Sequence, residues 1–163
     1  RPKKEINFLF NLLENFLIKK IDNLIKNEIK IKFIGERQIF SNKLKKILYE
    51  SEIKTSKNKK LHINIALNYG SKNEILRAVK LIIKKKEKLI EKNLENNLFT
   101  GDLPNPDILI RTGNTKRLSN FLLWQLAYTE IFFEKKLWPD FNSKDYKKII
   151  NTFKLLKRNF GNI

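Results

Sequence analysis

The first apolar stretch of the chain repeats at helical spacing. Between Ile6 and Ile25, apolar residues recur at intervals of three and four, which predicts one long helix. The positions in this stripe are Ile6, Phe10, Leu13, Leu17, Ile21 and Leu24. Phe8, Leu9, Leu12 and Phe16 widen it, so we expect the helix to be apolar over most of its circumference.

Four shorter segments have the pattern of strands. Ile29–Gly35 alternates apolar and polar residues, and Leu61–Leu67 is a second strand of similar length. Leu103–Ile110 opens with two prolines and leads into a short buried strand, and Ile131–Phe133 is a strand before a turn at Trp138-Pro139.

Four further helices are predicted between and after these strands. Each begins at a residue whose side chain can cap a helix N-terminus. They run from Ser41 to about Tyr49, from Ser71 with a Glu74 capping box to about Leu94, from Ser119 to about Tyr128, and from Asn142 or Ser143 to Phe160.

Strands that alternate with helices predict an α/β fold with a largely parallel sheet flanked by helices. A chain of 163 residues is large enough to bury a substantial core, and we interpret residues 1–163 as a single domain. The chain contains no cysteine, which excludes disulfides and thiolate metal sites. It also has no apolar run near the length of about 20 residues that spans a bilayer, so we expect a cytoplasmic protein.

The formal net charge of +18 favours anionic partners, but lysine is spread over every segment together with isoleucine, asparagine and phenylalanine. An AT-rich coding sequence explains this composition without a partner. The chain has no basic stripe with interleaved aromatic residues, so we do not expect it to bind nucleic acid.

The stretch IRTGNTKRLSNF, from Ile110 to Phe121, concentrates groups that bind anions. Arg111 follows a predicted strand, where ligands of parallel sheets gather, and the Arg111 and Arg117 guanidinium groups can each hold two phosphate oxygens. Ser119 adds a hydroxyl at the start of a predicted helix. These residues can form a diphosphate cradle; the alternative is a basic surface loop in which Ser119 only caps a helix.

The longer segment Pro106–Phe141 resembles the family of cis-prenyltransferases, whose bacterial representative is undecaprenyl diphosphate synthase. The matching motifs are R-T-G, R-x-S-N-F, L-L-W-Q-x-A-Y-x-E and L-W-P-D-F, all with intact spacing. Further matches are R-P at Arg1, I-G at Ile34, N-I-A-x-N-Y-G from Asn64 and R-x-F-G from Arg158, so the resemblance spans the chain.

The resemblance implies a transferase that condenses isopentenyl diphosphate units in cis onto an allylic diphosphate, usually farnesyl diphosphate, with Mg²⁺. It implies a homodimer that makes a long-chain lipid carrier for the cell wall, such as undecaprenyl diphosphate, at the cytoplasmic membrane surface. It also implies roles for six residues. Arg111, Arg117 and Ser119 match positions that hold isopentenyl diphosphate, Glu130 matches a carboxylate associated with Mg²⁺ across the dimer interface, Arg1 matches an arginine of the substrate loop, and Asn68 matches an asparagine beside the active site.

Other interpretations exist for some of these residues. Glu130 can be a solvated carboxylate at a helix end, and Asn68 can be a turn residue. The side chains that widen the first helix, Phe8, Leu9, Leu12 and Phe16, can line a channel for the growing hydrocarbon or can be ordinary core; this inference comes from the apolar pattern and not from the family.

The chain departs from the family pattern in two places. Asn114, Thr115 and Lys116 replace the usual glycine, glutamate and histidine after R-T-G, which affects the expected metal handling. The family's N-terminal H-x-M-D-G-N-x-R-W segment, with its aspartate for Mg²⁺, has no counterpart here, and we expect the parent protein to carry it. The alternative is a non-catalytic partner subunit of a cis-prenyltransferase complex.

Overall fold

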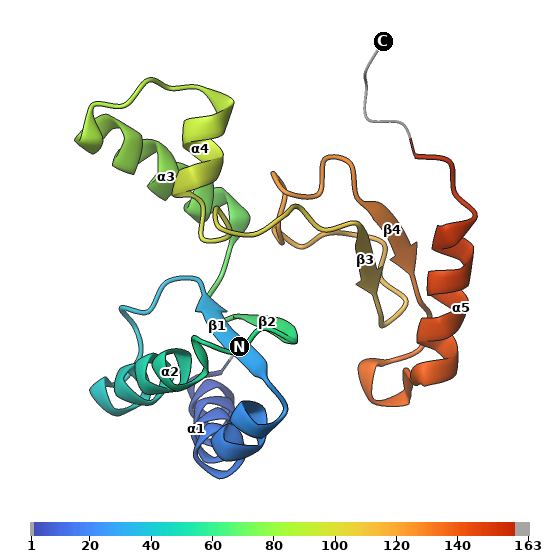
Figure 1. Cartoon of the computed structure of the whole chain (residues 1–163), viewed down its shortest axis with the longest axis horizontal. Helices are drawn as coiled ribbons and strands as arrows, with labels where there is room; N and C mark the ends of the chain where they lie inside the picture. The colour runs from blue at the N-terminus through green and yellow to red at the C-terminus, as the bar shows by residue number, and fades with distance from the viewer. Residues whose placement is uncertain (1, 159–163) are drawn as a thin grey trace. The chain divides into compact units, whose positions relative to one another are not determined.

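The computed structural model describes residues 2–158, which form two compact units divided between Tyr69 and Gly70. Each unit combines helices with one pair of parallel strands, so the predicted α/β class is confirmed (Figure 1). The organisation of residues 1–163 as one domain stays a prediction. No helix within residues 2–158 combines the length and the apolar character that a membrane span requires.

The first unit contains the four elements that the sequence predicts. They are α1 (Lys3–Lys26), β1 (Ile29–Ile34), α2 (Asn42–Thr55) and β2 (Leu61–Ala66). The strands are parallel, with Ile29 opposite Leu61 and Ile34 opposite Ala66. The Ser41 hydroxyl accepts a hydrogen bond from the backbone N–H of Leu44, which confirms the predicted cap of α2, although the helix continues past Tyr49.

The core of this unit lies between α1, α2 and β1. Leu17 on α1 and Leu48 on α2 are fully buried, and the Phe10 and Phe40 rings pack edge to face. The core consists of Leu17, Ile21, Leu24, Ile31, Phe33, Phe40, Leu44 and Leu48. The wide apolar pattern of the first helix therefore has one face in the core and a second face outside it.

Side chains of α2 bind backbone groups of β1 that β2 does not use. The Ile31 N–H donates to the Thr55 hydroxyl at 3.2 Å, and the Phe33 N–H donates to Glu52 Oε1 at 2.8 Å. Arg37 holds the same carboxylate with two hydrogen bonds of 2.9 and 2.6 Å. These contacts satisfy donors that would otherwise be exposed on a strand edge.

The end of β1 approaches the end of β2 closely at Gly35. Gly35 has φ +115°, and a Cβ atom built there would lie 2.1 Å from the Leu67 carbonyl oxygen. Only glycine combines this backbone angle with the available space. The Ile34-Gly35 motif is therefore a close-packing motif at the carboxyl ends of the two strands.

The second unit begins with a helical hairpin and continues with the other parallel pair. Its elements are α3 (Ser71–Lys85), α4 (Glu91–Asn97), β3 (Ile108–Arg111), β4 (Glu130–Phe133), the 3₁₀ helix η1 (Trp138–Asp140) and α5 (Ser143–Lys154). A small core of Ala78, Ile82, Leu94 and Leu98 joins α3 to α4, and Trp124 packs against it.

The capping box predicted at Ser71 and Glu74 is wrong. Gly70 is the N-cap of α3, and the Ser71 hydroxyl instead accepts a hydrogen bond from the Leu123 N–H at 3.0 Å. Glu74 is buried and binds the Phe99 N–H at 2.7 Å. Both side chains are used by distant segments, which a local pattern does not reveal. The helix also ends at Lys85, before a turn and α4.

The helix predicted from Ser119 to Tyr128 is also wrong, because this segment forms successive turns. Ser119, Asn120 and Leu122 have φ of +51°, +63° and +46°, which are left-handed angles that interrupt an α-helix. The last helix is predicted correctly at its start, where Asn142 and Asp145 form a capping box. It ends at Lys154 and not at Phe160, which lies outside the described residues.

Candidate functional site

The arginine-rich stretch forms a loop, residues 111–120, that starts at the carboxyl end of β3. The β3 and β4 strands are parallel, with Ile108 opposite Glu130 and Arg111 opposite Phe133. The carboxyl ends of parallel strands are the edge at which ligands usually bind. The sequence prediction that Arg111 stands at this edge is therefore supported by the register. We call residues 111–120 the arginine loop.

The start of the arginine loop is fixed to the chain that follows β4. The Gly113 N–H donates to the Lys136 carbonyl at 2.7 Å, and the Asn114 N–H donates to the Glu134 carbonyl at 3.1 Å. Gly113 and Asn114 have φ of +86° and +52°. Asparagine tolerates this conformation better than most residues, so the loop keeps its turn where the family commonly has glycine.

The end of the arginine loop is fixed to the first turn of α3 through Asn120. The Asn120 carbonyl accepts a hydrogen bond from the Ser71 N–H at 2.8 Å, and its Oδ1 accepts one from the Lys72 N–H at 2.9 Å. Asn120 therefore caps a helix that lies some fifty residues earlier in the chain. Its place in the R-x-S-N-F motif was visible in the sequence, but this long-range role was not.

The three predicted phosphate-binding side chains all belong to this loop. Arg111 is half-buried, and its Nε has no hydrogen-bond partner within the described part of the chain. Arg117 and Ser119 are exposed. Because Ser119 does not begin a helix, the expected contribution of a helix N-terminus is absent, and anion binding at this loop has to come from the side chains and nearby backbone N–H groups.

Glu130 lies at the opposite end of the strand pair from Arg111. It is the first residue of β4 and stands beside Ile108, three residues before Arg111 on β3. At the rise of a β-strand, this places the two residues about 10 Å apart along the strands. Glu130 is half-buried on a strand, so the interpretation as a carboxylate at a helix end is wrong. Within one chain, Glu130 and Arg111 are not at the same edge.

Asn68 follows β2 and is held in a turn against Glu36. Its Nδ2 donates to the Glu36 carbonyl at 2.9 Å, its own carbonyl accepts from the Glu36 N–H at 3.2 Å, and its φ is +48°. The turn interpretation is therefore correct, and the Asn68 Oδ1 and the second N–H of its Nδ2 remain for contact with substrate. Arg1, the other residue with an expected catalytic role, lies outside the described residues.

Four apolar side chains lie together on the outer face of α1. Phe8, Leu9, Leu12 and Phe16 are spaced so that they share about 100° of the helix circumference. Phe8 and Leu12 point away from the core residue Leu17, and all four side chains are between 40% and 61% exposed. In this unit they are therefore not ordinary core residues.

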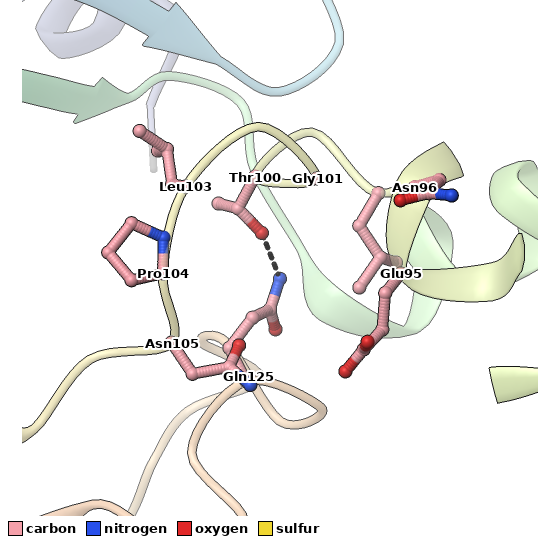
Figure 2. A pocket seen from close by; sticks show the side chains of 9 residues that line it. Glu95, Asn96, Thr100, Gly101, Leu103, Pro104, Asn105 and Gln125 are labelled. Carbon is pink, nitrogen blue, oxygen red and sulfur yellow. Dashed lines mark hydrogen bonds between the residues drawn. The ribbon is translucent and has the colours of Figure 1, made fainter. Parts of the chain in front are cut away.

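The second unit also contains a polar pocket that the sequence did not predict. This cavity of about 240 Å³ has nine lining residues, shown in Figure 2: Glu95, Asn96, Leu98, Thr100, Gly101, Leu103, Pro104, Asn105 and Gln125. The Gln125 amide is buried and donates to the Thr100 hydroxyl at 2.8 Å and to Glu74 Oε2 at 3.2 Å. These bonds cross-link α3, the loop after α4 and the segment before β4, which gives the L-L-W-Q motif a structural role.

Three comparisons identify the family. The family model of undecaprenyl diphosphate synthase matches residues 1–161. Isoprenyl transferases of Aquifex pyrophilus and Rickettsia bellii are 43% and 44% identical, cover 100% and 99% of this chain, and are themselves covered over 71% and 72% of their lengths.

Two solved structures are also similar, both with a TM-score of 0.90. A probable undecaprenyl diphosphate synthase from Campylobacter jejuni is 41% identical, with 99% of this chain and 76% of that chain covered. Lavandulyl diphosphate synthase from Lavandula x intermedia, in complex with dimethylallyl diphosphate, is 31% identical, with coverages of 99% and 73%. The chain belongs to the undecaprenyl diphosphate synthase family of isoprenyl transferases.

Proposed function

We propose that this protein condenses isopentenyl diphosphate in cis onto an allylic diphosphate, farnesyl diphosphate, and releases a long-chain polyprenyl diphosphate such as undecaprenyl diphosphate. The observation that carries the proposal is the arginine loop, which is fixed at both ends and leaves Arg117 and Ser119 exposed between them. A planar guanidinium group matches two oxygens of a diphosphate, and a fixed loop loses little conformational entropy when it binds one.

Arg111 adds a cation at the base of the same loop. Its buried Nε lacks a partner among residues 2–158, and a buried donor without a partner is unfavourable. A phosphate oxygen at the strand edge satisfies this donor. We assign Arg111, Arg117 and Ser119 to the diphosphate of isopentenyl diphosphate, whose negative charges the two guanidinium groups offset.

Mg²⁺ is the proposed cofactor, with Glu130 as its carboxylate in this chain. Within the described residues, no three His, Cys, Asp or Glu side chains gather into a metal-binding group. A small hard cation is commonly held by one or two carboxylates together with substrate phosphates and water, so one carboxylate and a diphosphate fit it. When bound, Mg²⁺ offsets the negative charge that grows on the leaving diphosphate.

The position of Glu130 supports a homodimer. The strand register separates Glu130 from the Arg111 edge of its own chain by about 10 Å, a distance that a glutamate side chain does not span. In a dimer, Glu130 can approach the arginine loop of the second chain. This arrangement reconciles a role near the metal with a position at the amino end of β4.

The outer face of α1 is the proposed wall of the product channel. Phe8, Leu9, Leu12 and Phe16 present a continuous apolar surface that suits a hydrocarbon tail. A soluble enzyme that binds such a tail has to deliver it to a bilayer, so we include contact with the cytoplasmic membrane surface in the proposal.

The substitution Arg117→Ala tests the central assignment. Loss of a charge-assisted pair is expected to raise the KM for isopentenyl diphosphate about 10- to 100-fold, while the unfolding midpoint stays unchanged because Arg117 is exposed. Lys135→Ala is the matched control, since it removes one exposed positive charge just after β4. An equal effect of both substitutions on the KM would contradict the assignment. A protein that binds isopentenyl diphosphate but yields no polyprenyl product would indicate a non-catalytic partner subunit.

A further inference from the structure

The hairpin of α3 and α4 carries exposed aliphatic side chains at its turn. On α3 the buried residues Ala78 and Ile82 face the small core, and Ile83 lies outside it with 70% of its surface exposed. In the turn between the helices, Leu89 is 67% exposed and Ile90 is half exposed. Figure 1 shows the two helices joined by this turn. Exposed aliphatic residues clustered at one end of a hairpin indicate a contact surface.

Lysines surround these aliphatic residues. Between Lys80 and Ile90 the chain has five lysines and one glutamate, which gives a net charge of +4. Lys85 binds Asn97 and Glu87, but the other four are exposed and form no ion pair within residues 2–158. We call this surface the hairpin tip; it consists of Lys80, Ile83, Lys84, Lys86, Lys88, Leu89 and Ile90.

The combination of residue types selects the kind of partner. Lysine is frequent throughout the chain, so charge alone does not distinguish this surface. Nucleic-acid surfaces place aromatic rings or arginine among their charges, and the hairpin tip has neither. Aliphatic side chains among lysines instead suit the boundary between anionic lipid headgroups and acyl chains, where each type of side chain finds its preferred surroundings.

We propose that the hairpin tip is a membrane-binding surface, with Ile83, Leu89 and Ile90 inserted at the headgroup level of an anionic bilayer and the four free lysines against the lipid phosphates. Lysine side chains can extend toward phosphates while their methylene groups cover apolar surface. This inference rests on the membrane contact included in the proposed function and names the surface that makes it. Vesicle binding requires no catalytic turnover, so its failure is distinguishable from a failure of the enzymatic assignment.

The test is cosedimentation of the full chain with vesicles. The vesicles contain phosphatidylcholine alone or with about one third phosphatidylglycerol, at low and at high salt. In the charge variant, Lys80, Lys84 and Lys88 become glutamine and Lys86 becomes asparagine, because Lys86 has φ +56°. Each lysine near an anionic surface contributes about fivefold in partitioning, so the charge variant is expected to bind at least tenfold more weakly.

A second variant and a control separate the two contributions. Ile83→Asn with Leu89→Asn is expected to weaken vesicle binding at least tenfold, at high salt as well as low, because the inserted aliphatic groups are lost. The control is a set of four exposed lysines on α5 changed to glutamine, which lowers the net charge by the same amount and is expected to bind nearly as the unchanged chain. These are Lys144, Lys147, Lys148 and Lys154.

Four results would overturn the proposal. The first is no preference of the unchanged chain for anionic vesicles, and the second is equal loss of binding in the tip and α5 charge variants, which would assign the effect to net charge. The third is full vesicle binding by the aliphatic variant. Loss of RNA binding by the tip charge variant with unchanged vesicle binding would also overturn it and favour a nucleic-acid partner.

Discussion

Asn120 joins the arginine loop to α3, and three substitutions at this residue separate its contributions. Asn120→Ala removes the Oδ1 acceptor that binds the Lys72 N–H at 2.9 Å, and places alanine at φ +63°. Loss of a helix cap costs about 1 kcal/mol, and a left-handed backbone costs alanine about 1 kcal/mol more than asparagine. The expected decrease in the free energy of unfolding is about 2 kcal/mol.

The two other substitutions isolate these terms. Asn120→Gly removes the cap but accepts the backbone angle, so a decrease of about 1 kcal/mol is expected. Asn120→Asp keeps the acceptor and places a negative charge near the first turn of α3, so stability close to that of the unchanged protein is expected. In a chain of this length, 1 kcal/mol corresponds to about 3 °C in Tm, which predicts decreases of about 6 °C for alanine and 3 °C for glycine.

Thermal and denaturant unfolding measure the stabilities of the three Asn120 variants, and steady-state kinetics measure their KM for isopentenyl diphosphate. Because Asn120 fixes one end of the loop that carries Arg117 and Ser119, Asn120→Ala is also expected to raise the KM for isopentenyl diphosphate. Equal stability of the alanine and aspartate variants would refute the capping role. An unchanged KM in a destabilised alanine variant would refute the link between the loop's anchor and substrate binding.

Three further substitutions test a close backbone approach in the first unit, and a buried carboxylate and an ion pair in the second. Gly35→Ala is expected to lower the free energy of unfolding by about 3 kcal/mol or more, measured with denaturant, because its Cβ would overlap the Leu67 carbonyl; a stability equal to that of the unchanged protein would contradict the close approach. Glu74→Ala is expected to cost about 3 kcal/mol in the same assay, since it leaves buried donors without an acceptor, and a loss below about 1 kcal/mol would show that the carboxylate is dispensable. The hydrogen bond from Lys136, and after it the one from the Asn142 backbone N–H, holds the pKa of Asp145 below its usual 3.8, so the ionised carboxylate stabilises the fold above pH 3.8 and this contribution is lost as the pH falls further. Asp145→Asn is therefore expected to lower Tm at pH 7 but not at about pH 2. An equal loss of Tm at both pH values would contradict an ionic cause.

The elements of the first unit were predictable because the residues that form its core recur at the spacing of a helix or a strand. The α1 stripe recurs every three or four residues, and the alternating residues Ile31 and Phe33 of β1 are buried in the core. Ser41 caps α2 through a bond three residues away, within reach of a sequence pattern. The last turns of α2 were not predicted, because their buried residues Ser51 and Thr55 are polar and polar residues do not indicate burial in a sequence pattern.

The errors in the second unit have a different cause. Ser71, Glu74 and Asn120 have the residue types of local caps, but each forms its bonds with a segment between 25 and 52 residues away. The apolar run after Ser119 has the composition of a helix, but residues at its start have left-handed backbone angles, and Asn120 among them binds the first turn of α3. A pattern of residue types predicts hydrogen-bonding capacity but not the partner.

The candidate site was predictable as a set of residues and not as a geometry. The spacing of Arg111, Arg117 and Ser119 carried the family resemblance, and the structure places all three on one loop at a strand edge. The separation of Glu130 from that edge depends on the register of β3 with β4, which the sequence did not provide.

Incorporation of radiolabelled isopentenyl diphosphate onto farnesyl diphosphate by the complete gene product, with and without Mg²⁺, tests the central claim most directly. We expect the unchanged protein to form a polyprenyl product that depends on Mg²⁺. Lys135→Ala is expected to form this product at a similar rate, and Arg117→Ala only at a much higher concentration of isopentenyl diphosphate. Absence of labelled polyprenyl product from the folded protein, or equal incorporation by the two variants, would contradict the account.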